Sequence, residues 1–280
     1  MIDGYRRSVS VWRKLGLRMT GLLAMSFVLC RMAAAQSGMP NAPAAPPPAS
    51  ASVLMTRALH LYDTRAYAAA LAVFRRAAEI GDVEAMMYIG VMCGTGQGTE
   101  VDYKEALDWF RRAANAGDAQ AMNNIGLLYY KGMDQPPNHR EALTWFHKAA
   151  DLGNSEAMFN TAVLFRDGLG VPVNYGEAMK WFRKAADAGD VVANNEMGAL
   201  FQKGQGVEVD YGEAMNWYRK AADSGNDSGM YNIGILYESG LGVNRDRDEA
   251  IMWYRKAAAA GNAAAKDRLK SLGVDASLPK

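Results

Sequence analysis

The stretch YGEAMNWYRKAADSGNDSGMYNIGILYESG, residues 211–240, decides how this chain folds, because it has a close copy earlier in the sequence. The copy, YKEALDWFRRAANAGDAQAMNNIGLLYYKG, occupies residues 103–132. Glycines recur every 36 residues, at Gly81, Gly117, Gly153, Gly189, Gly225 and Gly261, and tryptophans keep the same step. A fixed period of this size is typical of solenoids, whose units stack and share a continuous core.

Capping residues predict two helices in each unit. Asp102 and Glu105 have the spacing of a capping box, in which the cap side chain and the Glu each satisfy a free backbone donor. Apolar residues follow at helical spacing until Gly117, which suits the left-handed conformation past a helix end, and Asp118 caps the next helix. Glycine inside a helix costs roughly 1 kcal/mol against alanine, so its recurrence there predicts a close approach between helices. The positions are Gly90, Gly126, Gly198 and Gly234, with Ala162 in the remaining unit.

A glycine-rich connector links one unit to the next, for example GLGVPVN at residues 168–174 and GQGVEVD at residues 204–210. Loops of this kind can bind phosphate, but these lack the lysine of a P-loop and recur before every second helix. We therefore interpret them as structural turns. The connector at residues 132–138, which contains Met133, Asp134 and two prolines, lacks the second glycine, and there we expect a kink or an altered loop.

The recurring residues form the pattern A-x-x-x-I-G-x-L-Y-x-x-G-x-G-V-x-x-D-Y-x-x-A-x-x-W-[FY]-R-K-A-A-x-x-G. This pattern resembles the Sel-1-like repeat (SLR) family, a subclass of tetratricopeptide-type repeats, in five units over residues 82–261. The resemblance implies an all-α fold, an α/α superhelix (solenoid) of stacked antiparallel helix pairs that acts as a scaffold for protein–protein contacts. Residues 52–81 resemble an ordinary tetratricopeptide unit and predict an N-terminal cap. Residues 262–280 predict a C-terminal capping helix and tail with a polar outer face.

The N-terminus predicts export. A basic stretch ends at Arg18, an apolar run occupies residues 19–30, and small residues follow up to Ala35. This order is that of a signal peptide over residues 1–35, cleaved after Ala35 to release a periplasmic or secreted protein. The alternative is a retained anchor through residues 15–35 in the inner membrane, which would be the chain's membrane contact.

The rest of the chain argues against a nucleic-acid partner. Without residues 1–35 the chain keeps 31 − 6 = 25 basic and 30 − 1 = 29 acidic side chains, a charge of about −4. Such a mildly acidic body offers no electrostatic attraction to phosphate backbones. Residues 36–51 are rich in proline and alanine and predict a disordered linker between the leader and the folded part.

Residues that could carry chemistry are scattered. His60, His139 and His147 lie apart in the sequence, so we expect surface or capping roles and no metal site, which needs clustered ligands. Cys93 takes a place filled by large apolar residues in other units and predicts a buried core thiol. We therefore predict a protein that is not an enzyme and has no cofactor.

Two other functions stay open at this point. Some cysteine-rich secreted relatives in the SLR family are linked to β-lactam binding or hydrolysis, so the resemblance leaves room for an enzyme acting on β-lactam or peptidoglycan-like substrates. Those relatives carry a cysteine pair in each repeat, which this chain lacks. The remaining alternative is an assembly factor for an exported polysaccharide, anchored by a lipid on Cys30.

A partner-binding face is predicted on the first helix of each pair, which lines the concave side in tetratricopeptide-type stacks. If Ala121, Ile125 and Tyr129 face the core, the positions of residues 123 and 130 point away from it and that of residue 124 flanks them. Aromatic and amide groups interleave along these positions, which suits an extended peptide. The equally weighted alternative is that the asparagines bond neighbouring helices and only fix the stack. The candidate residues are Tyr88, Asn123, Asn124, Tyr130, Phe159, Asn160, Arg166, Asn195, Glu196, Gln202, Tyr231, Asn232 and Glu238.

Overall fold

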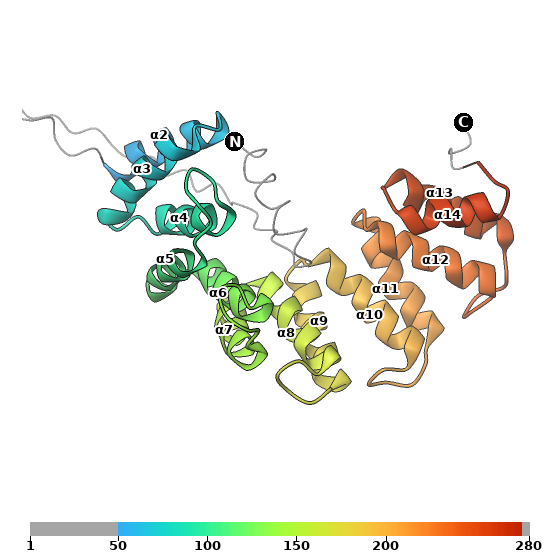
Figure 1. Ribbon diagram of the computed structural model, residues 1–280. Helices are drawn as coiled ribbons and strands as arrows, with labels where there is room; N and C mark the ends of the chain where they lie inside the picture. Colours follow the sequence, from blue (N-terminus) through green and yellow to red (C-terminus); the bar gives the residue numbers. More distant parts are fainter. Residues whose placement is uncertain (1–49, 276–280) are drawn as a thin grey trace, which may run out of the picture. The chain divides into compact units, whose positions relative to one another are not determined.

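A computed structural model describes residues 50–275 and shows 13 α-helices and no strand in that range (Figure 1). The first helices of the pairs are α2 (Ala51–Asp63), α4 (Val83–Thr95), α6 (Ala119–Lys131), α8 (Ser155–Asp167), α10 (Val191–Lys203) and α12 (Asp227–Ser239), and α14 (Ala263–Ser271) follows the last pair. The second helices are α3 (Tyr67–Glu79), α5 (Tyr103–Asn115), α7 (His139–Asp151), α9 (Tyr175–Asp187), α11 (Tyr211–Asp223) and α13 (Arg247–Ala259). The predicted all-α fold of stacked antiparallel helix pairs is confirmed. The predicted leader and nearly all of the predicted linker lie outside the described residues.

The chain divides into two compact units. Of the described residues, 50–128 and 133–135 belong to the first unit, and 129–132 and 136–275 belong to the second. In the first unit α3 packs against α2 and α4, and α4 also packs against α5. In the second unit each helix from α7 to α13 packs against the next helix in the chain. Within each unit, neighbouring helices therefore cover one another, which stabilises helices that are marginal alone at this length.

Aromatic residues on the second helices form the centre of each pair. The fully buried rings are those of Phe74, Phe110, Phe146, Phe182, Tyr218 and Tyr254. From α5 onward a tryptophan precedes each of these rings, and it is half-buried in every second helix except α11, where Trp217 is buried. A cation three residues later in the helix covers each tryptophan; for example, Nζ of Lys184 lies 4.0 Å from the ring centroid of Trp181. The ring after the tryptophan is thus the core residue, and the tryptophan lies at its edge.

The small residues inside the first helices permit this packing. A Cβ atom added to Gly90 would lie 2.5 Å from the ring of Phe110, and one added to Gly234 would lie 2.5 Å from the ring of Tyr254. Real Cβ atoms do not approach other atoms so closely, so these glycines allow the ring of the following helix to touch the backbone. The predicted close approach between helices is confirmed at these positions.

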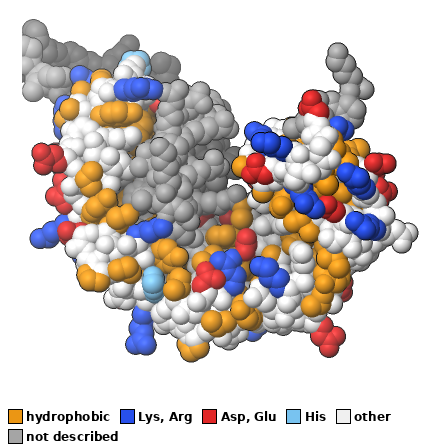
Figure 2. All heavy atoms as spheres, turned by 45° about the vertical axis from the view of Figure 1, so that its right-hand side comes forward, with side chains coloured by type: hydrophobic (Ala, Val, Ile, Leu, Met, Phe, Trp, Pro, Cys, Tyr) orange, Lys and Arg blue, Asp and Glu red, His pale blue; other side chains and the backbone are white. Residues whose placement is uncertain are grey.

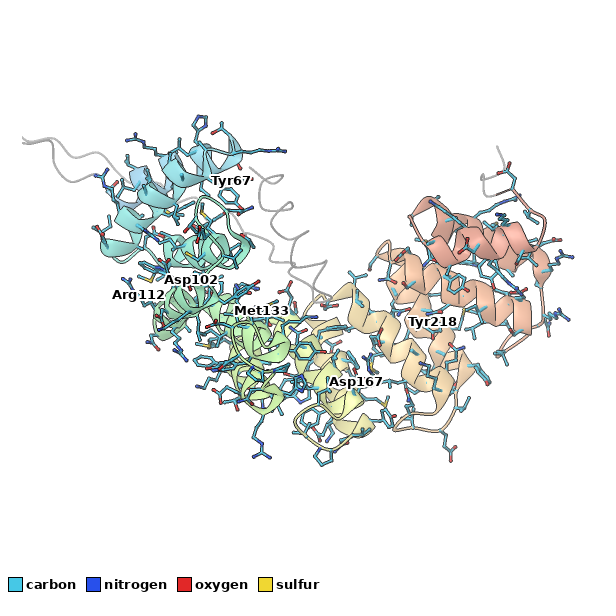
Figure 3. All side chains as sticks on the ribbon, viewed as in Figure 1. Tyr67, Asp102, Arg112, Met133, Asp167 and Tyr218 are labelled. Atoms are coloured by element: carbon cyan, nitrogen blue, oxygen red, sulfur yellow. The ribbon has the colours of Figure 1, made fainter. Side chains whose placement is uncertain are left out.

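The predicted caps are present, but only half of the predicted capping box forms. The carboxylate of Asp102, which is labelled in Figure 3, accepts a hydrogen bond from the backbone N–H of Glu105 at 2.8 Å. The Asp or Asn before α7, α9, α11 and α13 accepts the equivalent bond. The reciprocal bond was predicted wrongly. The backbone N–H of Asp102 donates instead to the carbonyl of Cys93 at 2.9 Å, because the connector returns along the preceding helix. The Glu105 carboxylate accepts from Nε1 of Trp109 at 3.1 Å.

The connectors are structural turns, as predicted. Gly168 ends α8 with φ +70°, and Gly170 has φ +75°. The expected alteration of the connector at residues 132–138 was wrong. It has the same length and the same pattern of bends as residues 168–174, and Asp134 takes the place of the second glycine with φ +66°. Aspartate tolerates this left-handed region better than most residues, so the turn survives the loss of glycine.

Candidate functional site

The predicted binding residues of the first unit are enclosed more than the helical projection indicated. Tyr88 is half-buried and stacks on Phe74, with ring centroids 4.7 Å apart. Asn123 and Asn124 are buried, although the projection placed residue 123 on the free face. A first helix packs on the second helices before and after it, as α4 does, and this leaves a narrower free face than a helix covered on one side. Neither amide atom of Asn124 has a hydrogen-bond partner within the described residues.

Two bridges join neighbouring first helices in the second unit. Nδ2 of Asn232 in α12 donates to Oδ1 of Asn195 in α10 at 2.9 Å. The guanidinium of Arg166 in α8 donates to Oε2 of Glu196 in α10 at 2.5 Å. These four residues were predicted from the sequence, and the structure brings them together in pairs. Asn232 thus makes the kind of contact expected of a stacking residue, while partner binding at these positions stays a prediction.

The last turns of the first helices contact the buried rings of the second helices. Gln202 accepts a hydrogen bond from the hydroxyl of Tyr218 at 2.5 Å. Glu238 accepts one from the hydroxyl of Tyr254 at 2.7 Å, and also binds Arg268. Burial raises the pKa of both tyrosines, so they stay protonated and donate.

A phenylalanine in the same place receives a different partner. The guanidinium carbon of Arg166 lies 5.9 Å from the ring centroid of Phe182, within the range of a cation–π contact. The residue in the last turn of the first helix is therefore a hydrogen-bond acceptor where the buried ring is a tyrosine, and a cation where the buried ring is a phenylalanine. This match indicates that positions 166, 202 and 238 contribute to packing, whatever else they bind.

The remaining predicted residues of the second unit also touch aromatic rings or lie buried. Phe159 meets Phe182 edge to face, with centroids 5.3 Å apart. Tyr231 is tilted against Tyr254 at 5.4 Å, and Tyr130 is tilted against a histidine ring at 5.2 Å. Asn160 is buried. The free surface of this row is therefore smaller than the set of candidate residues.

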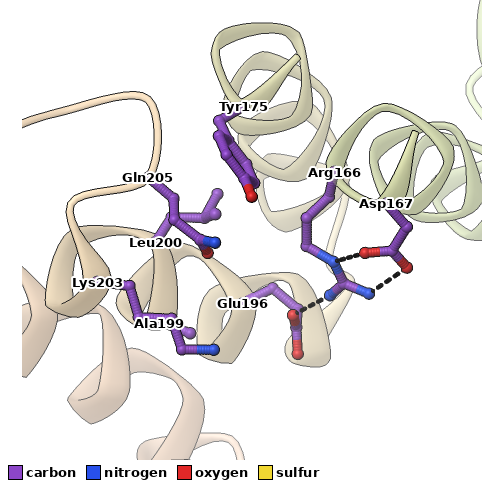
Figure 4. A pocket seen from close by; sticks show the side chains of 8 residues that line it. All are labelled: Arg166, Asp167, Tyr175, Glu196, Ala199, Leu200, Lys203 and Gln205. Carbon is purple, nitrogen blue, oxygen red and sulfur yellow. Dashed lines mark hydrogen bonds and ion pairs between the residues drawn. The ribbon is translucent and has the colours of Figure 1, made fainter. Parts of the chain in front are cut away.

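A cleft of about 300 Å³ lies between α8 and α10, beside the start of α9 (Figure 4). Arg166 and Glu196 line it and were predicted from the sequence. The other lining residues were missed: Asp167, Tyr175, Ala199, Leu200, Lys203 and Gln205. One signal could have found the cleft, because Ala199 is the smallest side chain in a row that otherwise reads Val91, Leu127, Val163 and Ile235.

The charges of the cleft are partly paired. Nε of Arg166 donates to Oδ1 of Asp167 at 2.7 Å, and a second guanidinium nitrogen donates to Oδ2 at 2.9 Å. The bond with Asp167 is the largest cause of a raised pKa at Arg166, so this cation is held firmly by two carboxylates. Lys203 is exposed and forms no ion pair with any described residue. On the face shown in Figure 2, acidic and basic side chains are interspersed among hydrophobic ones.

His147 lies in a different environment from the one predicted. Its ring stacks on Trp181 at 5.1 Å and lies 6.2 Å from the ring of Phe165, and its Nε2 is buried with no hydrogen-bond partner within the described residues. The prediction of a surface or capping role was therefore wrong for this residue. A flat imidazole fits between two rings in a place where other repeats carry a longer arginine.

Acid is expected to weaken the fold through His147. Burial lowers its pKa below the ordinary value of 6.5, and the charge of Lys184 acts in the same direction while Asp151 and Glu177 oppose it. As pH falls below about 6.5 the unfolded chain binds more protons than the folded one, so stability decreases. The urea midpoint should therefore fall more between pH 7 and pH 5.5 in the native protein than in His147→Phe. His60→Gln, at an exposed histidine, should behave like the native protein; equal pH dependence in all three would contradict the assignment.

Cys93 is a buried core thiol, as predicted. It is 0% exposed, and burial is the largest cause of a pKa raised to about 12, with the Glu105 carboxylate adding to it. Residues 50–275 contain no group of three or more His, Cys, Asp or Glu side chains that could hold a metal ion. None of the helices in this range is both long enough and apolar enough to cross a membrane.

Comparisons with known proteins agree with the fold. The family model of the Sel1 repeat matches residues 83–118, 119–154, 155–190, 191–226 and 227–262. A Sel1 repeat protein from Oxalobacter formigenes is 33% identical, with a TM-score of 0.72 over 78% of this chain and 89% of that one. No curated protein matches the chain significantly.

Two further solved structures are similar. The protective antigen c5321, present in uropathogenic Escherichia coli strains, displays an SLR fold and is 29% identical, with a TM-score of 0.72. The match covers 81% of this chain but 51% of c5321, so the chain spans about half of that antigen. Pseudomonas aeruginosa pilF, 18% identical with a TM-score of 0.57 over 79% of this chain and 97% of its own, shares the fold alone. With five matched repeats and a relative of one third identity over most of both chains, the chain belongs to the Sel1 repeat family.

Proposed function

We propose that this protein is an exported scaffold of the cell envelope that performs no catalysis and binds a protein or peptide partner on the face carried by its first helices. Sel1 repeat proteins are in general scaffolds for protein–protein contacts, and this chain has their fold.

The observation that carries the binding face is a contrast between two rows of the repeat. The core positions, which are the alanines, the glycines and the buried ring after each tryptophan, recur every 36 residues with little change. The row of residue 123 changes character at each step and reads Met87, Asn123, Phe159, Asn195 and Tyr231. Packing of the core requires the recurring positions to stay the same. Recognition of one particular partner requires side chains that differ from repeat to repeat, as in the row of residue 123. Met87, Phe159 and Tyr231 in this row are half-buried and can contact a peptide, whereas Asn123 and Asn195 are buried.

The binding face can be tested by crosslinking inside the cell. The full chain would carry a photoreactive amino acid at Phe159 or Tyr231, on first helices, or at Met252, which is exposed on the second helix α13. We expect a discrete protein adduct from the first two positions and none from Met252. Adducts of equal yield from all three sites, or from none, would refute the proposed face.

Export can be tested independently by the intact mass of the protein purified from its host. The mass expected is that of a chain that begins at Gln36. A mass that includes residues 1–35 would indicate the retained anchor, and an added acyl group on Cys30 would indicate a lipoprotein. Either result would replace the free periplasmic or secreted form by a membrane-attached one.

A further inference from the structure

The cleft between α8 and α10 coincides with two departures from the repeat. Ala199 replaces the branched aliphatic residue of the other four repeats, which removes two or three carbon atoms from this place. Glu196 replaces the asparagine found at the same step in three other repeats. Gln205 lines the same cleft; at this step the first connector also carries glutamine, Gln97, whereas the neighbouring connectors carry Leu169 and Leu241. These departures from the repeat lie at separate positions in the sequence, yet they line the same cavity. This coincidence indicates that the cavity binds a ligand.

The groups around the cleft are polar and directed into it. Figure 4 shows the hydroxyl of Tyr175, the amide of Gln205 and the ammonium of Lys203 turned toward the space that Ala199 leaves open. None of these three polar ends makes a hydrogen bond with a described residue. Glu196 gives one oxygen to Arg166 and keeps the other without a hydrogen bond within the described residues. Both donors and an acceptor are thus free to bind a ligand.

The charge balance selects among ligands. Arg166 and Lys203 are balanced by Asp167 and Glu196, so a ligand with a net charge of either sign would be repelled by part of the site. The two groups with free capacity have opposite signs and lie seven residues apart on one face of α10, about 10 Å at 1.5 Å per residue. A ligand with both charges, held at a similar separation, would satisfy both ends.

We propose that the cleft binds an extended segment of the partner protein, in which a basic side chain reaches Glu196 and an acidic side chain reaches Lys203. This inference rests on the proposed scaffold function. Charged residues two apart in an extended chain point to the same side and lie about 7 Å apart, and their long side chains extend to about 10 Å. Tyr175 and Gln205 bind the backbone between them, and Ala199 lets that backbone approach α10. The volume of about 300 Å³ admits two or three residues of an extended segment and excludes a helix.

Binding can be measured with labelled peptides and the full-length protein. The probes are four acetylated and amidated hexapeptides with identical neutral residues, in which the two positions, two apart, carry Lys and Glu, Lys and Gln, Gln and Glu, or Gln and Gln. We expect the Lys and Glu peptide to bind at least fivefold more tightly than each of the others in fluorescence anisotropy at low salt. Equal affinity of all four peptides would overturn the proposal. So would tightest binding by the Gln and Glu peptide, which would indicate a simple anion site.

Filling the cleft gives a second, structural test. Ala199→Ile introduces the residue of the following repeat, so the variant should fold with an unchanged helix signal and an unfolding midpoint no lower than that of the native protein. Its affinity for the Lys and Glu peptide should fall at least tenfold. Val163→Ile, in the same row of the preceding repeat, is the matched control and should bind normally. An Ala199→Ile protein that binds like the native one would refute the site.

The contribution of the Lys203 charge is tested separately from that of the space beside Ala199. Lys203→Gln should lower the affinity for the Lys and Glu peptide to that for the Lys and Gln peptide, whereas Lys104→Gln, at an exposed lysine in α5, should change neither affinity.

The experiments distinguish a failure of the scaffold function from a failure of the cleft. If a partner crosslinked to Phe159 is still captured by Ala199→Ile, the scaffold stands and the cleft is not its site. If no position crosslinks but the peptides discriminate as expected, the cleft stands and the scaffold face is wrong.

Discussion

Phe182→Ala is expected to destabilise the second unit by about 3–5 kcal/mol, the usual cost of emptying a buried phenylalanine site. The ring of Phe182 is 0% exposed and belongs to the same buried cluster as Met197 and Trp217. It also meets Phe159 edge to face and lies under the guanidinium of Arg166. Its removal leaves a cavity shared by two adjacent helix pairs, so neither pair can close it alone.

The matched control is the tryptophan one residue earlier. Trp181 is half-buried, and Lys184 covers one face of its ring, so Trp181→Ala should cost less than Phe182→Ala although more atoms are removed. Both variants would be compared by urea unfolding and by amide hydrogen exchange in α8, α9 and α10, because repeat proteins can unfold in parts. A loss at Trp181 equal to or larger than that at Phe182 would contradict the assignment of the core.

Gly170→Ala is expected to be the second most damaging change, with a loss of about 2–5 kcal/mol. The residue has φ +75°, where a left-handed conformation costs an alanine roughly 1–2 kcal/mol. In addition, a Cβ atom would lie 2.7 Å from the backbone of His139 and Arg140 at the start of α7. Backbone atoms at a helix start cannot move aside as a side chain does, and overpacking of this kind costs about 1–3 kcal/mol.

Gly189→Ala separates the two contributions. Gly189 has φ +91°, but a Cβ atom there would have nothing within 4 Å. Its substitution should therefore cost only the conformational part, about 1–2 kcal/mol. The difference between the two unfolding free energies, measured by denaturant titration, gives the packing contribution of the connector. Equal losses would mean that the contact between residues 168–174 and α7 contributes nothing to the stack.

Most of the fold could be predicted because its signals are local and repeated. The cap at Asp102, the helix stop at Gly117 and the small residue at Gly90 each act within one or two turns of chain, and the 36-residue step multiplies the signal. The prediction of the reciprocal capping-box bond was wrong because a carbonyl from another segment of the chain accepts the hydrogen bond instead. The backbone N–H of Asp102 donates to the carbonyl of Cys93, while the Glu105 side chain accepts from Arg75 and Trp109, and spacing alone does not reveal these partners.

The candidate site was less predictable, because burial and partnership depend on several helices at once. The helical projection of α6 placed Asn123 on a free face, and the structure buries it. His147 was read as a surface residue, yet it lies between Phe165 and Trp181 of the next helix pair. The cleft exists because the side chain of Ala199 is small. A small side chain creates an open space only if the neighbouring side chains do not fill it, and the sequence does not show those neighbours.

By itself, then, the sequence determined the repeat, the helix pairs, their caps and their mutual dependence, since these follow from residues close together in the chain and from a fixed period. Only the tertiary structure decided which ring is the core, which polar groups face each other and where space remains. Those properties belong to contacts between residues some 16 to 37 positions apart, from Gln202 with Tyr218 to Asn195 with Asn232, and their geometry is set by packing rather than by local preference.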